Sequence, residues 1–220
     1  MNRQSCARVW FVAILLALVV SGCATSLMGT TKGRVSEGNY YSPLENFVLP
    51  LPTPMFGDVR IQDRNDAQSG LVSVLDDMGN NEGVTYVSLS GEAGTIQILP
   101  EGVDSVYRSF VYEYVLPGLF QPVSPQSKVV HEEFLDSRPD RAFFAIAVIP
   151  GASSLMDGKT GKLVESVRAL LAFDDGKYMY MLHLEMNTGL SRVNSDSLTE
   201  GDLAGARSAL KTMRASIRFQ

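Results

Sequence analysis

The hydrophobic pattern of this 220-residue chain predicts mostly β-strands beyond residue 57. Short runs that are apolar, or that alternate between apolar and polar residues, are separated by clusters of Gly, Asn and Asp, as in strands joined by turns. The expected strands are 58–62, 70–75, 84–89, 128–134, 141–149, 163–173 and 177–185. After Arg141 the run 141–149 is apolar on both faces, which predicts a central strand that is covered on both sides.

The clearest local signal is Asp174-Asp175-Gly176, which separates the last two expected strands. A glycine after two aspartates suits a tight hairpin that needs a left-handed backbone position. Alternation in the last strand then places Tyr178, Tyr180, Leu182 and Leu184 on one face, and Lys177, Met179, Met181, His183 and Glu185 on the other.

Two segments have the period of an α-helix instead. In residues 101–116 apolar side chains recur at i, i+3, i+4, i+7 and i+8, and Pro117-Gly118 is expected to end this helix. Its apolar face consists of Val103, Val106, Tyr107, Phe110, Val111, Tyr114 and Val115. A second helix is expected at about 200–213, followed by a short extended piece; its apolar face consists of Leu203, Ala206, Leu210 and Met213.

These elements predict an α+β fold, in which an antiparallel β-sheet is flanked by helices at about 101–116 and 200–213. Two stretches, RALLAFDDGKYMYMLHLEM and ALKTMRASIRF, resemble the PsbP-like fold, which is named for a photosystem extrinsic protein and is shared by some bacterial envelope lipoproteins. The resemblance implies a protein that binds or assembles rather than one that catalyses. It implies no particular ligand, and the helix at 101–116 has no clear place in it.

The first residues have the pattern of a secretory signal. Arg3 and Arg8 precede the apolar run 9–20, which is shorter than the roughly 20 residues that span a bilayer. The run ends in Val20-Ser21-Gly22-Cys23, which resembles the lipobox of bacterial lipoproteins. The resemblance implies cleavage between Gly22 and Cys23, and lipid chains on Cys23 that hold the protein to a membrane. A short anchor helix with a chance cysteine is the alternative.

The chain is therefore expected to have three parts: a signal peptide (1–22), a lipidated Cys23 with a flexible tether (23–39), and a single α+β domain (40–220). Within the domain, the proline-rich residues 40–56 are expected to be extended and packed on its surface, with a ligand for a peptide-binding module as the alternative. In Gram-negative lipoproteins a residue such as Ala24 after the cysteine implies the outer membrane, facing the periplasm.

Composition limits the expected binding partners and the possible cysteine chemistry. The formal charge is −5, and removal of residues 1–22 would lower it by two, because Arg3 and Arg8 are lost with no acidic residue. No basic stripe is present, so nucleic acid is not an expected partner, and the membrane is expected to be reached through the lipid on Cys23 rather than through charge. Cys23 would be the only thiol of the mature chain, which excludes an internal disulfide.

Little in the chain points to catalysis or to a metal. His131 and His183 are the only histidines, and no G-x-S-x-G, H-E-x-x-H, EF-hand or P-loop motif occurs. His183 and Glu185 share a strand face and form a two-ligand fragment that lacks a third ligand; a half-buried strand histidine is the alternative. His131 shares a face with Glu133, whereas Glu132 is expected to point away. We therefore expect no catalytic, cofactor or metal site.

Three functional hypotheses remain open. The first is a non-catalytic binding or assembly module that meets a protein or a small apolar ligand in the envelope. Its candidate contact residues are Tyr107, Tyr112, Tyr114, Met179 and Met181. The second is an envelope hydrolase with His183 or His131 as the base, which requires a pocket that joins one histidine to a carboxylate and a serine. The third is a structural subunit of an envelope complex.

Overall fold

The computed structural model describes residues 32–54, 57–77, 79–89, 103–135, 141–153, 155–186, 193 and 195–220. All of them belong to a compact unit that begins at Thr31. The expected signal peptide, the lipobox and Cys23 lie outside the described residues. Among the helices that are described, none has the length and apolar character needed to cross a membrane.

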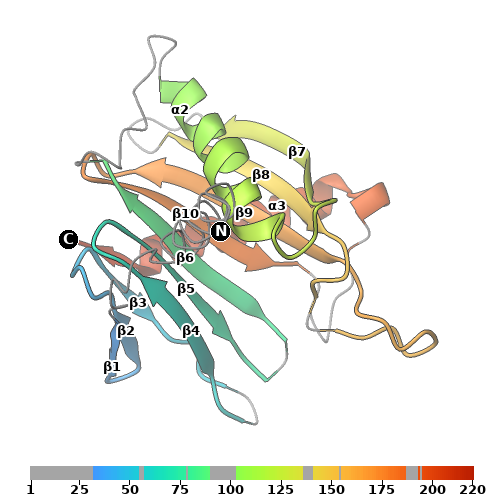
Figure 1. Ribbon diagram of the computed structural model, residues 1–220, viewed down its shortest axis with the longest axis horizontal. Helices are drawn as coiled ribbons and strands as arrows, with labels where there is room; N and C mark the ends of the chain where they lie inside the picture. Colours follow the sequence, from blue (N-terminus) through green and yellow to red (C-terminus); the bar gives the residue numbers. More distant parts are fainter. Residues whose placement is uncertain are drawn as a thin grey trace, which may run out of the picture. The chain divides into compact units, whose positions relative to one another are not determined.

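The described residues form a seven-stranded antiparallel sheet in the order β4-β5-β6-β10-β9-β8-β7 (Figure 1). Its strands are β4 (Arg60–Asn65), β5 (Ser69–Leu75), β6 (Asn81–Ser88), β7 (Lys128–Leu135), β8 (Ala142–Ile149), β9 (Ser166–Asp174) and β10 (Tyr178–Glu185). All seven expected strands are present, with shifted ends. The β9–β10 hairpin turns at Gly176, whose φ of 85° is the predicted left-handed position. Strand β8 is buried on both faces as expected, although it lies next to the edge rather than at the centre.

A second sheet of four strands joins the beginning of the domain to its end. Its order is β1 (Arg34–Ser36), β2 (Asn39–Tyr41), β3 (Phe47–Pro50) and β11 (Arg218–Phe219). The prediction that the tether reaches residue 39 is therefore wrong at its C-terminal end, because residues 34–36 pair with β2. The expectation that residues 40–56 pack on the surface is also wrong in part. Tyr40, Phe47 and Leu49 are buried in the core, which outweighs the low strand propensity of the prolines around them.

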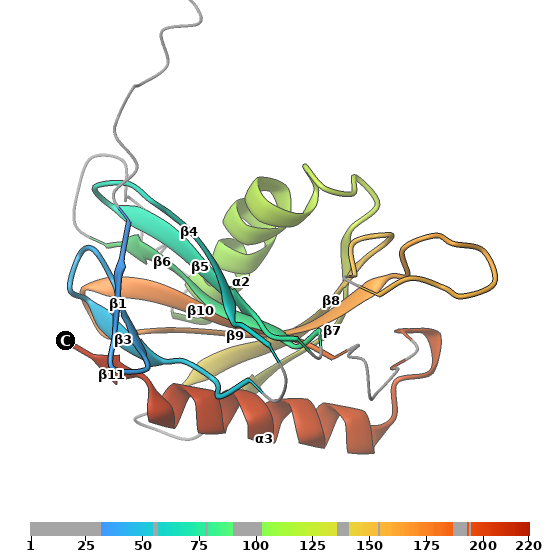
Figure 2. The same ribbon diagram turned by 90° about the horizontal axis from the view of Figure 1, so that it is seen from below.

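Helices cover both faces of the larger sheet (Figure 2). The first face packs against α3 (Glu200–Ser216), whose Leu203, Ala206, Leu210 and Met213 enter the core as predicted. The second face packs against α2 (Val103–Ser109) and the helix that follows it. The 3₁₀ turn η2 (Ser195–Ser197) precedes α3. The predicted α+β class, an antiparallel sheet flanked by helices, is confirmed.

The first helix departs from its prediction. α2 continues as the π-helix η1 (Phe110–Phe120), which runs past Pro117, so the expectation that Pro117-Gly118 ends the helix at 116 is wrong. A π-helix bonds each amide to a carbonyl five residues earlier, and the buried side chains of η1 follow that spacing. They are Phe110, Val111, Val115, Leu116 and Phe120. Pro117 removes one amide donor, but the apolar side chains on either side of it are held against the sheet. The wider turn also leaves Tyr114 exposed, off the core face on which it was expected.

Candidate functional site

Buried polar side chains lie together where β10 ends. Arg168 of β9 and Glu185 of β10 are register partners, and an ion pair of 3.6 Å joins Nη2 of Arg168 to Oε2 of Glu185. His183 lies two residues before Glu185 on the same face and is paired with Gly83 of β6. The glycine makes room for the imidazole, because a Cβ at position 83 would lie 2.6 Å from Cε1 of His183. The predicted alternation thus brings His183 and Glu185 together.

Burial determines the charge of this cluster. His183 is 2% exposed, and its Nε2 atom has no hydrogen-bond partner in the described part of the chain. Burial, and then the positive charge of Arg168, lower the pKa of His183 to about 3, so the imidazole is neutral at neutral pH. Burial raises the pKa of the Glu185 carboxyl, while Ser153, Arg168 and Ser166 oppose the increase.

The cluster contains the residue types of a hydrolase without their arrangement. A general base must reach the hydroxyl that it activates, and the substrate must reach both. Nε2 of His183 contacts no hydroxyl among the described residues, and both His183 and Glu185 are sealed from solvent. His183 is 2% exposed, which corrects the expectation of a half-buried strand histidine. The strand face that it shares with Met179 and Met181 is covered by α2 and η1, which the strand pattern could not show. No group of three His, Cys, Asp or Glu side chains that could hold a metal ion occurs among the described residues.

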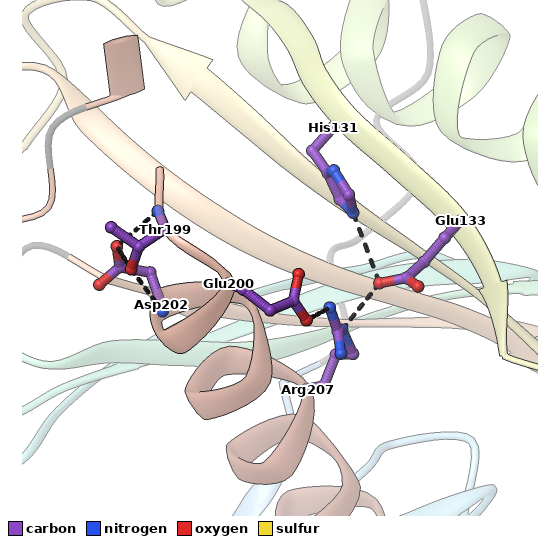
Figure 3. Close-up of polar contacts among 6 residues, drawn as sticks. All are labelled: His131, Glu133, Thr199, Glu200, Asp202 and Arg207. Atoms are coloured by element: carbon purple, nitrogen blue, oxygen red, sulfur yellow. Dashed lines mark hydrogen bonds and ion pairs between the residues drawn. The ribbon is translucent and has the colours of Figure 1, made fainter. Parts of the chain in front are cut away.

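His131 belongs to a different, surface network on the α3 side of the sheet. Figure 3 shows Glu133 of β7 between His131 and Arg207 of α3. Oε1 of Glu133 lies 3.4 Å from Nε2 of His131 and 2.7 Å from Nε of Arg207, and Arg207 also donates to Glu200 at 2.6 Å. Glu132 points to the other face, as the alternation predicted, and pairs with Arg108. The network ties the edge strand to the helix, and no serine of the described residues takes part in it.

The start of α3 is fixed by the capping box that Figure 3 also shows. The Thr199 hydroxyl accepts from the amide of Asp202 at 3.2 Å, and the Asp202 carboxylate accepts from the amide of Thr199 at 2.9 Å. This cap sets the register of the helix and thereby places Arg207 opposite Glu133.

The residues expected to form a contact surface divide into buried and exposed ones. Tyr107 is buried on the inner side of α2, and Met179 and Met181 of β10 are buried beneath α2 and η1, so the prediction that these three residues contact a partner is wrong. The strand pattern placed both methionines on one face, but it did not show that a helix covers that face. Tyr112 and Tyr114 are exposed at 38% and 40%.

The exposed tyrosines lie over polar groups that satisfy one another. The Tyr112 hydroxyl donates to Oε2 of Glu132 at 2.8 Å, and Arg108 pairs with the same carboxylate. Burial and then the Glu132 contact raise the pKa of Tyr112 to about 12. Tyr114 stacks on Phe110, with 5.5 Å between ring centres. The polar groups at this surface are therefore already engaged with one another and do not point to a bound ligand.

A pocket of different character lies between the C-terminal half of α3 and strands β7 to β9. Its volume is about 410 Å³, within the range of roughly 300–1,000 Å³ that is usual for small-molecule sites. It is lined by Leu135, Ala142, Leu171, Lys211, Arg214, Ala215 and Phe219. Apolar side chains from the strands face the helix, which contributes the two cations.

The helix presents these cations side by side. Lys211, Arg214 and Ala215 are spaced i, i+3 and i+4, so they share one side of α3, next to its core stripe. The Arg214 guanidinium lies 4.1 Å from the ring centre of Phe173 and is held there by a cation–π contact. The small side chains of Ala142 and Ala215 leave the pocket open. Sequence reasoning missed this site, because its lining residues come from five elements of the fold.

No protein-family model matches this chain. No curated protein matches it either. Among solved structures, the solution structure of cyanobacterial PsbP (CyanoP) from Synechocystis sp. PCC 6803 is similar, with 13% sequence identity and a TM-score of 0.43. The match covers 90% of this chain and 98% of that chain. A similarity of this size assigns neither a family nor a function.

Proposed function

We propose that this chain is a lipid-anchored protein of the bacterial cell envelope whose α+β domain binds a small ligand and does not catalyse its conversion. The observation that carries the binding role is the pocket of about 410 Å³ between α3 and strands β7 to β9. It is concave and largely apolar, and it has a small number of charged groups, which is the usual make-up of a ligand site.

The positions of the two histidines support binding over hydrolysis. His183 is buried in the domain with a strongly lowered pKa, and His131 is engaged with Glu133 at the surface. Neither histidine lines the pocket next to α3. The pocket therefore lacks the histidine base that the hydrolase hypothesis requires.

The anchor is supported by the Val20-Ser21-Gly22-Cys23 motif and by the apolar run before it. We expect the N-terminal peptide of the membrane-purified protein to begin at Cys23 and to carry a lipid-sized mass. In the Cys23→Ala variant this mass should be absent and the protein should leave the membrane fraction. Given Ala24, fractionation of a Gram-negative source should place the protein in the outer membrane. An unmodified chain that keeps residues 1–22 would contradict the anchor.

The binding role can be tested with an uncharged fluorescent probe, N-phenyl-1-naphthylamine, on the full chain carrying Cys23→Ala, so that no anchor lipid competes. The fluorescence of the probe should rise as it enters the apolar pocket. Ala215→Trp should abolish this rise, because the indole enters the pocket from an exposed helix position. Ala204→Trp, at an exposed position of the same helix outside the pocket, is the matched control. Equal binding by both variants would show that the probe binds elsewhere.

A further inference from the structure

The pocket next to α3 joins two kinds of surface that favour different parts of one ligand. Leu135 of β7, Leu171 of β9 and Phe219 of β11 offer apolar contact, while Lys211 and Arg214 stand together on one side of α3. No acidic side chain is among the described residues that line it. A chain with a formal charge of −5 thus places two cations beside an apolar hollow.

These features argue for an occupant with an anionic head and an apolar tail. Leu171 and Ala142 are buried strand residues, so the apolar side of the pocket is continuous with the core and removes hydrocarbon from water. Lys211 is exposed and Arg214 is half-buried, so both can keep contact with water while they meet a negative group at the mouth. A purely polar anion would leave the apolar side uncovered, and an uncharged hydrocarbon would gain nothing from the cations.

We infer that the pocket formed by α3 and strands β7 to β9 binds a single-chain anionic amphiphile, with its acyl or alkyl chain against Leu135, Leu171 and Phe219 and its carboxylate or phosphate head at Lys211 and Arg214. This inference rests on the proposed binding function and specifies the ligand class of the same site. Arg214 is positioned for the role, because its stacking on Phe173 holds the guanidinium in place before a ligand arrives.

The cations also have a structural task that the test must separate from binding. Arg214 lies in the last turn of α3, where a positive charge interacts favourably with the helix C-terminus. The variants Lys211→Gln and Arg214→Gln are therefore compared with wild type in thermal unfolding as well as in ligand binding. A role in helix stability alone would lower the melting temperature and leave ligand affinities unchanged.

The test is isothermal titration calorimetry of the full chain carrying Cys23→Ala with octanoate, octanol, acetate and octyl phosphate. Octanoate has both head and tail, octanol lacks the charge and acetate lacks the tail. We expect octanoate to bind more tightly than octanol or acetate, and more weakly as salt rises. The double variant Lys211→Gln/Arg214→Gln should raise the Kd of octanoate about tenfold and leave that of octanol unchanged. Octyl phosphate shows which anionic head is preferred.

Two further variants locate the site. Ala215→Trp should abolish binding of both octanoate and octanol, whereas Ala204→Trp and Lys159→Gln, which change exposed residues outside the pocket, should change neither. If octanol binds as tightly as octanoate and the charge variants have no effect, the anionic head is refuted while the binding function stands. If no probe binds, including the uncharged naphthylamine, both the inference and the proposed function are refuted.

Discussion

The burial of His183 predicts a measurable acid sensitivity. In the unfolded chain its pKa is about 6.5, and in the folded domain burial and Arg168 lower it to about 3. Because the folded-state pKa is the lower one, neutral His183 contributes its full stability above pH 6.5, and this contribution is lost as the pH falls toward 3. The difference between the two pKa values corresponds to a loss of about 5 kcal/mol of unfolding free energy once the pH is well below 3. At pH 5 the loss is already about 2 kcal/mol.

The perturbation that isolates this contribution is His183→Gln, which cannot gain a proton. Burial raises the pKa of Glu185, which has the opposite effect on the pH dependence of stability, since a buried carboxyl is more stable when it is protonated. Glu185 is present in wild type and variant alike, so its contribution largely cancels in the comparison. At pH 7.5 the variant should be less stable than wild type, because glutamine does not fill the space that Gly83 leaves for the imidazole.

The assay is urea unfolding followed by circular dichroism at pH 7.5, 6 and 5, with the free energy of unfolding taken at each pH. Between pH 7.5 and 5 the wild type should lose about 2 kcal/mol more than His183→Gln does. Leu170→Ala is the matched control, because it truncates the buried register partner of His183 without removing a titratable group, so it should keep the pH dependence of the wild type. Parallel curves for wild type and His183→Gln would refute the inference that His183 is held neutral in the folded protein.

Other predictions concern the same core and the helix below it. Glu185→Ala should cost about 3–5 kcal/mol of unfolding free energy in a urea titration, because Arg168 is left buried without its partner, and Arg168→Met/Glu185→Leu should recover most of the loss. If the double variant stays as unstable as Glu185→Ala, the ion pair itself stabilises the fold. Gly83→Ala should destabilise by about 2 kcal/mol or more, because its Cβ would lie 2.1 Å from a backbone oxygen, whereas Gly205→Ala, with open space around it, should stabilise by about 0.5–1 kcal/mol. Thr199→Ala should cost about 1 kcal/mol through loss of the capping box, and an unchanged melting temperature would contradict that role.

The fold shows where local pattern is sufficient and where it fails. The β9–β10 hairpin and the core stripe of α3 were predictable, because Gly176 and the apolar spacing act within a few residues of chain. The course of η1 past Pro117 was not predictable in this way. The burial of Leu116 and Phe120 against the sheet outweighs the loss of one amide donor, and that burial exists only after the sheet has formed.

The pairing between strands from the two ends of the domain also could not be predicted from the local sequence pattern. β1 fell within the expected tether, β2 lay at the boundary between the tether and the extended segment 40–56, and β11 was expected only as a short extended piece, because strands of two or three residues carry almost no periodic signal. They become strands through their partners, since β3 pairs with both β2 and β11. The buried aromatic side chains Tyr40 and Phe47 then provide the apolar contact that holds this small sheet in place.

The candidate sites follow the same division. The sequence by itself determined that His183 shares a face with Glu185, that Glu132 points away from His131, and that no catalytic motif occurs, because strand alternation and motif spacing are local properties. Only the tertiary structure decided that His183 is sealed away from solvent and that Met179 and Met181 are core residues beneath α2 and η1. It alone also formed the pocket at Lys211 and Arg214, because a pocket depends on side chains that packing brings together from distant segments of the chain.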